Sequence, residues 1–247
     1  MSFNHILRGM LLTLPIMIGI IPLGIIFGAQ AVQAGFEPLA AIFMPAINFA
    51  GGSEFAVIPL WSITPLILLI ILTTFLINSR HLVMGAALAP YLEGQPFYRV
   101  ALIYFFMCDE TWALTLQEMA HLEEKGKNKP LLNPGFYFGI GVTLWASWVL
   151  SCSLGVLLGS VSGDLSIYGF NMAMPATFIA LSAAMWPLKR YKKDYAKLLP
   201  ILASAAVSAL VSLKLGSAYS VGLGVLAGIV TAFIQASKKN NKVITNL

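Results

Sequence analysis

Residues 9–34 read GMLLTLPIMIGIIPLGIIFGAQAVQA, a run of 26 residues that contains no charged side chain. An α-helix needs about 20 mainly apolar residues to cross a bilayer. The apolar part of a cleaved signal peptide is only about 7 to 15 residues long. We therefore expect this run, which directly follows Arg8, to form a first membrane helix that is retained.

The rest of the chain has the composition of a membrane protein. Its 247 residues are 58% hydrophobic and 10% charged, and their mean hydropathy is +0.83. A soluble domain carries about 25% charged residues. The sequence predicts a single integral membrane transport domain over residues 1–247, all-α, with about seven to eight transmembrane helices.

The net charge of +5 comes from basic residues that gather in short polar gaps, at 125–129, 189–197 and 238–242. Cytoplasmic loops of membrane proteins carry an excess of Lys and Arg. The gaps therefore indicate orientation in the lipid bilayer, and no nucleic-acid partner is expected. With these anchors inside, residues 133–161 run outward, residues 166–187 return, and residues 198–213 and 216–236 form the last hairpin.

The N-terminal half is less regular. Residues 38–50 and 81–92 form apolar runs of only about 12 to 13 residues, too short to span about 30 Å as straight helices. Residues 55–77 and 98–116 are each long enough for a complete crossing. We expect interrupted helices near Gly51-Gly52 and Asn78-Arg80, with three crossings here and eight in all. Seven crossings with a re-entrant segment are the alternative.

Two stretches of the chain resemble each other. Leu23-Gly24 with Gly28 recurs as Leu154-Gly155 with Gly159, and Met44-Pro45-Ala46 recurs as Met174-Pro175-Ala176, at offsets of 131 and 130 residues. The matches indicate a possible internal repeat (about 10-120 and 134-236) whose copies run in the same direction. Chance similarity in a chain rich in Leu and Gly is the alternative. Glycines four residues apart also favour close helix packing.

Four ionisable side chains lie within the apolar segments or at their interruptions: Glu54, Arg80, Asp109 and Glu110. A single charge at the centre of a membrane helix costs roughly 2.5 to 3.5 kcal/mol. We therefore expect these groups to be paired, neutralised or in contact with water.

Residues 49–56 read FAGGSEFA, the composition of a broken helix. Freed backbone near Gly51 and Gly52, with Ser53 at a helix N-terminus, could bind a substrate carboxylate. Glu54 could accept an ammonium group or a proton. The alternative is a tight external turn that leaves Glu54 in water.

A second interruption reads Asn78-Ser79-Arg80-His81. The guanidinium of Arg80 can bind a carboxylate through two parallel hydrogen bonds. Asn78 adds an amide, and His81 has a side chain suited to proton handling. The alternative is an interfacial loop in which Arg80 reaches the lipid headgroups.

The third site consists of Asp109 and Glu110, which lie inside the run 98–116. Adjacent residues of a helix point about 100° apart. One carboxyl could therefore face Arg80 while the other takes up a proton, which crowding in a low dielectric favours. The alternative is an ion pair with Arg80 that only locks helices together.

These motifs resemble those of the AzlC-like branched-chain amino-acid exporter family, the large subunit of a two-component bacterial exporter. The resemblance rests on four stretches of sequence. They are residues 22–24 with 27–28, residues 49–56, residues 78–81, and Asp109-Glu110 followed by Trp112-Ala113-Leu114. It implies export of leucine, isoleucine, valine or analogues, a small AzlD-like membrane partner and a bacterial inner-membrane location. Family members usually have Gln in place of Glu54, so the substrate range could differ here.

The interpretation that follows is a secondary exporter, with no cofactor and no metal. Gly51, Gly52, Ser53, Asn78 and Arg80 would bind the carboxylate of the amino acid. Asp109, Glu110, Glu54 or His81 would carry a coupling proton, and an apolar wall from Phe49, Phe55 and Met84 would accept the side chain. Transport of another small solute remains open, as does a membrane assembly subunit without a pore. An intramembrane enzyme using His81 with Asp109 lacks a nucleophile motif.

Overall fold

The computed structural model describes residues 3–61, 64–126, 130–161, 198–215 and 217–244. Within these ranges the chain forms helices and no strand. Three stretches are long and apolar enough to cross a membrane by length and composition: Phe3–Gln33, Ile67–Leu92 and Pro134–Ser160. The protein is an all-α membrane protein, as its composition predicts.

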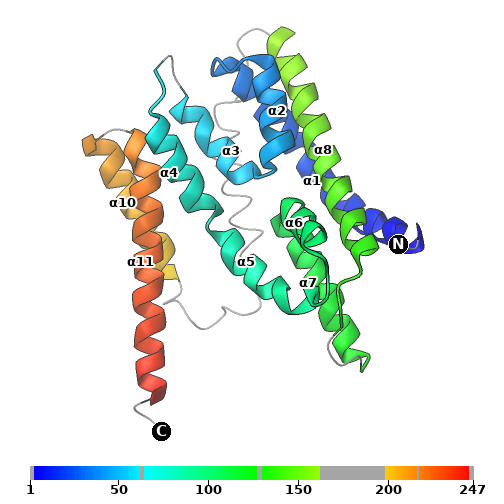
Figure 1. Cartoon of the computed structure of the whole chain (residues 1–247). Coiled ribbons are helices and arrows are strands. Elements are labelled where there is room, and N and C mark those ends of the chain that lie inside the picture. The colour runs from blue at the N-terminus through cyan, green and yellow to red at the C-terminus, as the bar shows by residue number, and fades with distance from the viewer. Residues whose placement is uncertain (1–2, 62–63, 127–129, 162–197, 216, 245–247) are drawn as a thin grey trace. The chain divides into compact units, whose positions relative to one another are not determined.

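The frame of the first compact unit, residues 1–58 and 78–174, is the pair α1 (Phe3–Gln33) and α8 (Pro134–Val161). The two helices lie side by side over much of their length (Figure 1). Gly9 of α1 contacts Phe136 near the start of α8. Gly28 contacts Cys152 and Val156, which lie further along both helices. The helices are therefore parallel.

Glycines make this close approach possible. A Cβ atom on Gly28 would overlap the backbone oxygen of Cys152, and one on Gly155 would overlap that of Ile25. Gly24 and Gly159 also face the partner helix, so both glycine pairs of the predicted repeat lie on one interface. The parallel arrangement agrees with copies that run in the same direction. Met174-Pro175-Ala176 lies outside the described residues, and the repeat stays a prediction.

Between α1 and α8 the chain forms short helices. They are α2 (Pro38–Asn48), α3 (Gly51–Val57), the 3-10 turn η1 (Ile58–Leu60), α4 (Ile67–Asn78), α5 (Arg80–Leu88), η2 (Ala89–Leu92), α6 (Phe97–Phe105) and α7 (Asp109–Glu124). The predicted interruptions are confirmed, although the first lies at Phe49-Ala50 while Gly51 and Gly52 are already helical. The second lies at Ser79, the single residue between α4 and α5, which keeps helical backbone angles.

Two runs that were expected to form continuous membrane helices are divided into shorter helices. Residues 55–77 divide into α3, η1 and α4, because Pro59 and Pro65 lack the N–H that a continuous helix needs. Residues 98–116 divide into α6 and α7 at Phe106–Cys108. Cys108 is extended, with φ −118° and ψ 175°, and the acidic pair after it begins a new helix, where carboxylates are favoured.

The second unit, residues 59–77 and 175–247, contains the packed pair α10 (Leu199–Leu215) and α11 (Ser217–Ile244). A Cβ on Gly224 would overlap the Ser208 side chain, so a glycine again permits close packing. These helices match the predicted hairpin. The expected crossing at residues 166–187 lies outside the described residues.

Substituting Gly28 by Ala should destabilise the protein, because the new methyl group meets the α8 backbone, which cannot move aside cheaply. Overpacking of this kind costs about 1 to 3 kcal/mol. Gly19→Ala, in the same helix but with nothing within 4 Å of the new Cβ, should leave stability unchanged or slightly higher. Thermal unfolding of the two purified variants in detergent measures the difference. Equal unfolding temperatures would contradict the packing assignment.

Candidate functional site

Two tryptophans of α8 hold the interruption between α2 and α3. The indole Nε1 of Trp145 donates to the Ala46 backbone oxygen at 2.9 Å, one of the carbonyls left free where α2 ends. One turn later, Trp148 Nε1 donates to Glu54 in the first turn of α3, also at 2.9 Å. Phe49 between the two helices has a left-handed backbone with φ 45°. The α8 scaffold thus fixes a conformation that a bulky residue rarely adopts.

Glu54 is a buried carboxylate, with 1% of its surface exposed. Its Oε1 accepts from the Ala50 backbone N–H at 2.9 Å, and its Oε2 accepts from Trp148. Each carboxylate oxygen therefore has an N–H donor. The alternative, a tight external turn with Glu54 in water, is therefore excluded. Gly51 leaves room for the Trp148 ring, which a Cβ would meet at 3.1 Å.

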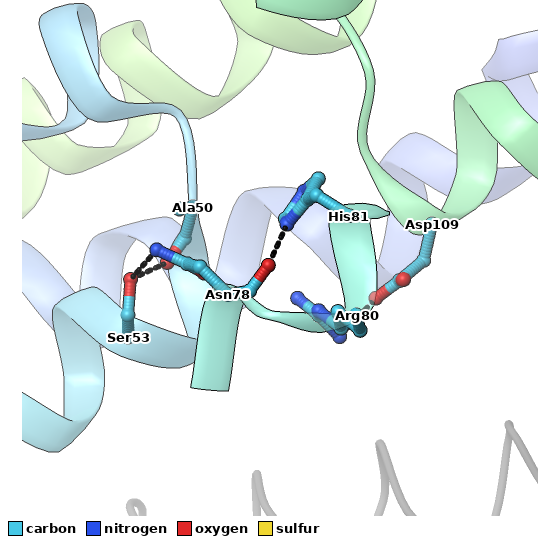
Figure 2. Close-up of polar contacts among 6 residues, drawn as sticks. All are labelled: Ala50, Ser53, Asn78, Arg80, His81 and Asp109. Carbon is cyan, nitrogen blue, oxygen red and sulfur yellow. Dashed lines mark hydrogen bonds and ion pairs between the residues drawn. The ribbon is translucent and has the colours of Figure 1, made fainter. Parts of the chain in front are cut away.

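A chain of polar contacts leads from this interruption to the second one (Figure 2). Ser53 Oγ donates to the Ala50 oxygen at 2.9 Å, and Asn78 Nδ2 donates to Ser53 Oγ at 3.0 Å. His81 Nδ1 lies 3.1 Å from the Asn78 backbone oxygen. The two predicted broken segments are thus joined by direct hydrogen bonds, so Ser53 and Asn78 belong to one cluster.

Arg80 and Asp109 form the predicted ion pair, with 2.5 Å between Nη1 and Oδ2 (Figure 2). The side chains remain 32% and 23% exposed, so the pair is accessible rather than sealed. Arg80 is the first residue of α5 and Asp109 the first of α7. Glu110 follows in the same helical turn and is partly buried. The pair therefore joins the second interruption to the third.

The third interruption also has a support on α8. Tyr137 is fully buried, and its Oη donates at 2.7 Å to the Ile103 backbone oxygen, near the end of α6. This bond satisfies a carbonyl that the helix end leaves free. Residues of α8 thus contact helix ends at both Phe49-Ala50 and Phe106–Cys108.

Three buried polar atoms near the Arg80–Asp109 pair have no hydrogen-bond partner within the described part of the chain. They are Asn78 Oδ1, Arg80 Nε and Trp112 Nε1. Trp112 lies three residues after Asp109, so both side chains project from the same side of α7. Sequence reasoning did not select Trp112 as a site residue, although a tryptophan one turn after an acidic pair was a usable signal. A buried polar atom without a hydrogen-bond partner lowers the stability of the protein. The two donors, Arg80 Nε and Trp112 Nε1, and the acceptor, Asn78 Oδ1, could instead bind a polar ligand.

The predicted apolar wall is not a single surface. Phe55 packs against Phe27 and Trp148, with ring centroids 5.4 Å and 6.4 Å away. Met84 belongs instead to a cluster with Leu88, Ile103 and other buried residues, against which Trp112 packs. Only Met84 therefore lies in the apolar cluster beside Trp112. No group of three or more potential metal ligands occurs among the described residues.

Comparison with known proteins adds independent information. A family model described as AzlC protein matches residues 15–161. The inner membrane protein YgaZ of Escherichia coli is 27% identical over 236 residues, covering 91% of this chain and 88% of its own. The branched-chain amino acid transport protein AzlC of Bacillus subtilis is 30% identical over 190 residues, 75% of this chain and 69% of its own. No solved structure matches.

Replacing Trp148 by Phe should destabilise the protein more than replacing Trp145 by Phe. Both changes remove an indole of α8 and a 2.9 Å hydrogen bond. Trp148 is buried against Phe27 and Phe55 and donates to the fully buried Glu54, whereas Trp145 is only partly buried. A buried polar atom that loses its partner costs about 1 to 3 kcal/mol. Thermal unfolding in detergent measures both. An equal loss would argue against the Trp148–Glu54 hydrogen bond as the main support of this interruption.

Proposed function

Because the chain belongs to the AzlC family, we propose that it is a secondary transporter that exports branched-chain amino acids across the bacterial inner membrane. It crosses the membrane several times, is coupled to protons and acts with a small AzlD-like membrane subunit. The name of the Bacillus subtilis relative supports the substrate class, and that of the Escherichia coli relative supports the location.

The observation that carries the proposal is the set of unpaired atoms beside the Arg80–Asp109 pair. An amino acid presents a carboxylate with acceptors and an ammonium group with donors. Its carboxylate can accept from Arg80 Nε and Trp112 Nε1, and its ammonium group can donate to Asn78 Oδ1. The aliphatic side chain would then lie against the cluster that contains Met84. Each unpaired atom gains a partner of the right kind.

The proposed proton coupling uses Asp109, which accepts from Arg80 Nη1 in the structure. A charged Asp109 can attract the ammonium group of a substrate that lies beside this pair. A proton that binds Asp109 removes the negative charge and weakens substrate binding. Proton and substrate then bind in turn, as export driven by an inward proton gradient requires. Glu110, Glu54 and His81 remain candidates for passing the proton onward. Gly51, Gly52 and Ser53, at the neighbouring interruption, remain candidates for binding the substrate carboxylate.

The parallel packing of α1 and α8 supports a multi-pass topology. If both helices run from the cytoplasm outward, the chain between them must cross the membrane an odd number of times to begin α8 on the cytoplasmic side. The segments α2 with α3, α4 with α5, and α6 with α7 supply three such crossings, each broken near a polar residue. Broken helices near the membrane midplane are typical of substrate sites in secondary transporters.

Other functions fit the site less well. A hydrolase would need His81 beside an activated nucleophile, but His81 Nδ1 faces a backbone oxygen and Asp109 pairs with Arg80. An assembly subunit without a pore gives no reason for unpaired donors and acceptors beside an accessible ion pair. Transport of another zwitterionic solute would use the same atoms.

Leucine flux in proteoliposomes tests the proposed function. The wild-type chain, reconstituted with and without a small AzlD-type subunit, should move leucine faster when a pH gradient is imposed. Asp109→Asn with Glu110→Gln should lose at least about tenfold of the gradient-driven flux, because no carboxyl remains to bind the proton at this position. Glu123→Gln, near the other end of α7, serves as the matched control and should keep the wild-type flux.

Two results would contradict this account. Wild-type proteoliposomes without leucine flux in either form would refute the transport function. Full gradient-driven flux in the Asp109→Asn, Glu110→Gln variant would refute coupling through these carboxyls while leaving transport intact.

Trp112→Phe should weaken leucine binding without loss of stability. The indole N–H has no partner in the described residues of the unliganded protein, so folding loses no hydrogen bond. Binding loses one donor to a carboxylate, worth about 1.4 kcal/mol or a tenfold rise in Kd. Equilibrium binding of leucine and thermal unfolding measure the two effects. Unchanged affinity would remove Trp112 from the site.

A further inference from the structure

A cavity with both apolar and charged lining residues lies toward the other end of α7. It has a volume of about 480 Å³ and is lined by the first turns of α1 and α8 and by the last three turns of α7. Glu118 in this cavity lies nine residues after Asp109, about 13 Å further along the helix. The cavity is therefore separate from the Arg80–Asp109 site, and nothing in the proposed mechanism uses it so far.

An ion pair crosses this cavity. Arg8 donates two hydrogen bonds to Glu118, from Nη1 to Oε1 at 2.8 Å and from Nη2 to Oε2 at 2.6 Å. The Arg8 guanidinium also lies over the Phe136 ring, 5.3 Å from its centroid. Arg8 is 49% exposed while Glu118 is only 13% exposed. The positive partner can therefore be reached from the cavity, and the negative partner is largely covered.

The remaining lining is suited to a small amphipathic molecule. Glu124 and His121 add a second carboxylate and an imidazole on α7, and Leu12 and Leu114 add aliphatic surface. A volume of about 480 Å³ lies within the range of about 300 to 1,000 Å³ that small-molecule sites occupy.

The ion pair itself selects the charge type of the ligand. An anion that binds Arg8 leaves Glu118 without its partner, and a cation that binds Glu118 leaves Arg8 without its partner. Leaving one member of a partly buried pair alone is unfavourable. A zwitterion can separate the two side chains and pair with both of them, its carboxylate with Arg8 and its ammonium group with Glu118 or Glu124.

We propose that this cavity is a second substrate site, which receives a zwitterionic amino acid with an aliphatic side chain before it reaches Arg80 and Asp109. The site rests on the proposed transport function for its role in flux, but the binding of a zwitterion can be tested without transport. The basic gap at 125–129, which directly follows α7, places the cavity at the cytoplasmic end of the protein. An exporter collects its substrate from that side.

Protection of an introduced cysteine tests the site directly. Ala120→Cys adds a thiol to the cavity lining, and Glu123→Cys adds one to the same helix outside the lining. The native Cys108 and Cys152 are partly and fully buried, so they compete little for a maleimide. Leucine should slow labelling of the first variant at least fivefold and leave the second unchanged. Leucinamide, a cation, and 4-methylpentanoate, an anion, should protect neither variant.

Charge-free variants supply the second arm of the experiment. Arg8→Gln with Glu118→Gln removes both charges together, so no orphan charge disturbs folding, and it should abolish the protection of Ala120→Cys. In proteoliposomes the same pair of changes should raise KM for leucine at least tenfold and change kcat less than twofold. Glu123→Gln should change neither value.

The possible results distinguish failure of this second site from failure of the proposed transport function. Protection by leucine without flux supports the site and refutes transport. Flux without protection at Ala120→Cys refutes the site and leaves transport standing. Equal protection by all three compounds, or protection that persists without Arg8 and Glu118, also refutes it, because the ligand would then not be recognised by the ion pair.

Discussion

The structure depends on how α8 stabilises helix ends inside an apolar protein. Trp148 gives its N–H to the buried Glu54 carboxylate, and Trp145 gives its N–H to a free carbonyl at the end of α2. A hydrocarbon environment supplies no water to satisfy such groups. Without these two donors the interruption at Phe49-Ala50 would carry unpaired polar atoms, and a continuous helix would be favoured. The interruption exists because a neighbouring helix satisfies its polar groups.

The same principle extends through the first compact unit. Glycines bring α1 and α8 into close parallel contact, and this pair gives the short helices a rigid surface to pack against. Tyr137 then supports the end of α6, and Ser53 with Asn78 links the first two interruptions. Two ion pairs attach α7, Arg80–Asp109 at its first residue and Arg8–Glu118 in its second half. Apolar packing attaches it as well, because Met119 is buried and Trp112 and Leu116 pack against the cluster that contains Met84.

Part of this arrangement could be predicted from the sequence. Apolar run lengths correctly indicated an all-helical membrane protein, and charges within those runs correctly indicated the Arg80–Asp109 pair and interruptions near Gly51 and Asn78. Hydropathy could not reveal the interruption at Phe106–Cys108, because those residues are as apolar as their neighbours. The division of residues 55–77 has a different cause, because Pro59 and Pro65 end the helices and an average of hydropathy does not register them. The roles of Trp145 and Trp148 depend on contacts between distant segments, which no local pattern encodes.

A cryo-electron microscopy structure of the protein with L-leucine tests the central claim most directly, which is that the polar helix interruptions form an amino-acid site. The account predicts leucine density with the carboxylate within hydrogen-bond distance of Arg80 Nε and Trp112 Nε1 and the ammonium group next to Asn78 Oδ1. Saturating leucine that leaves these three atoms unliganded, with the Arg80–Asp109 pair unchanged, would contradict it.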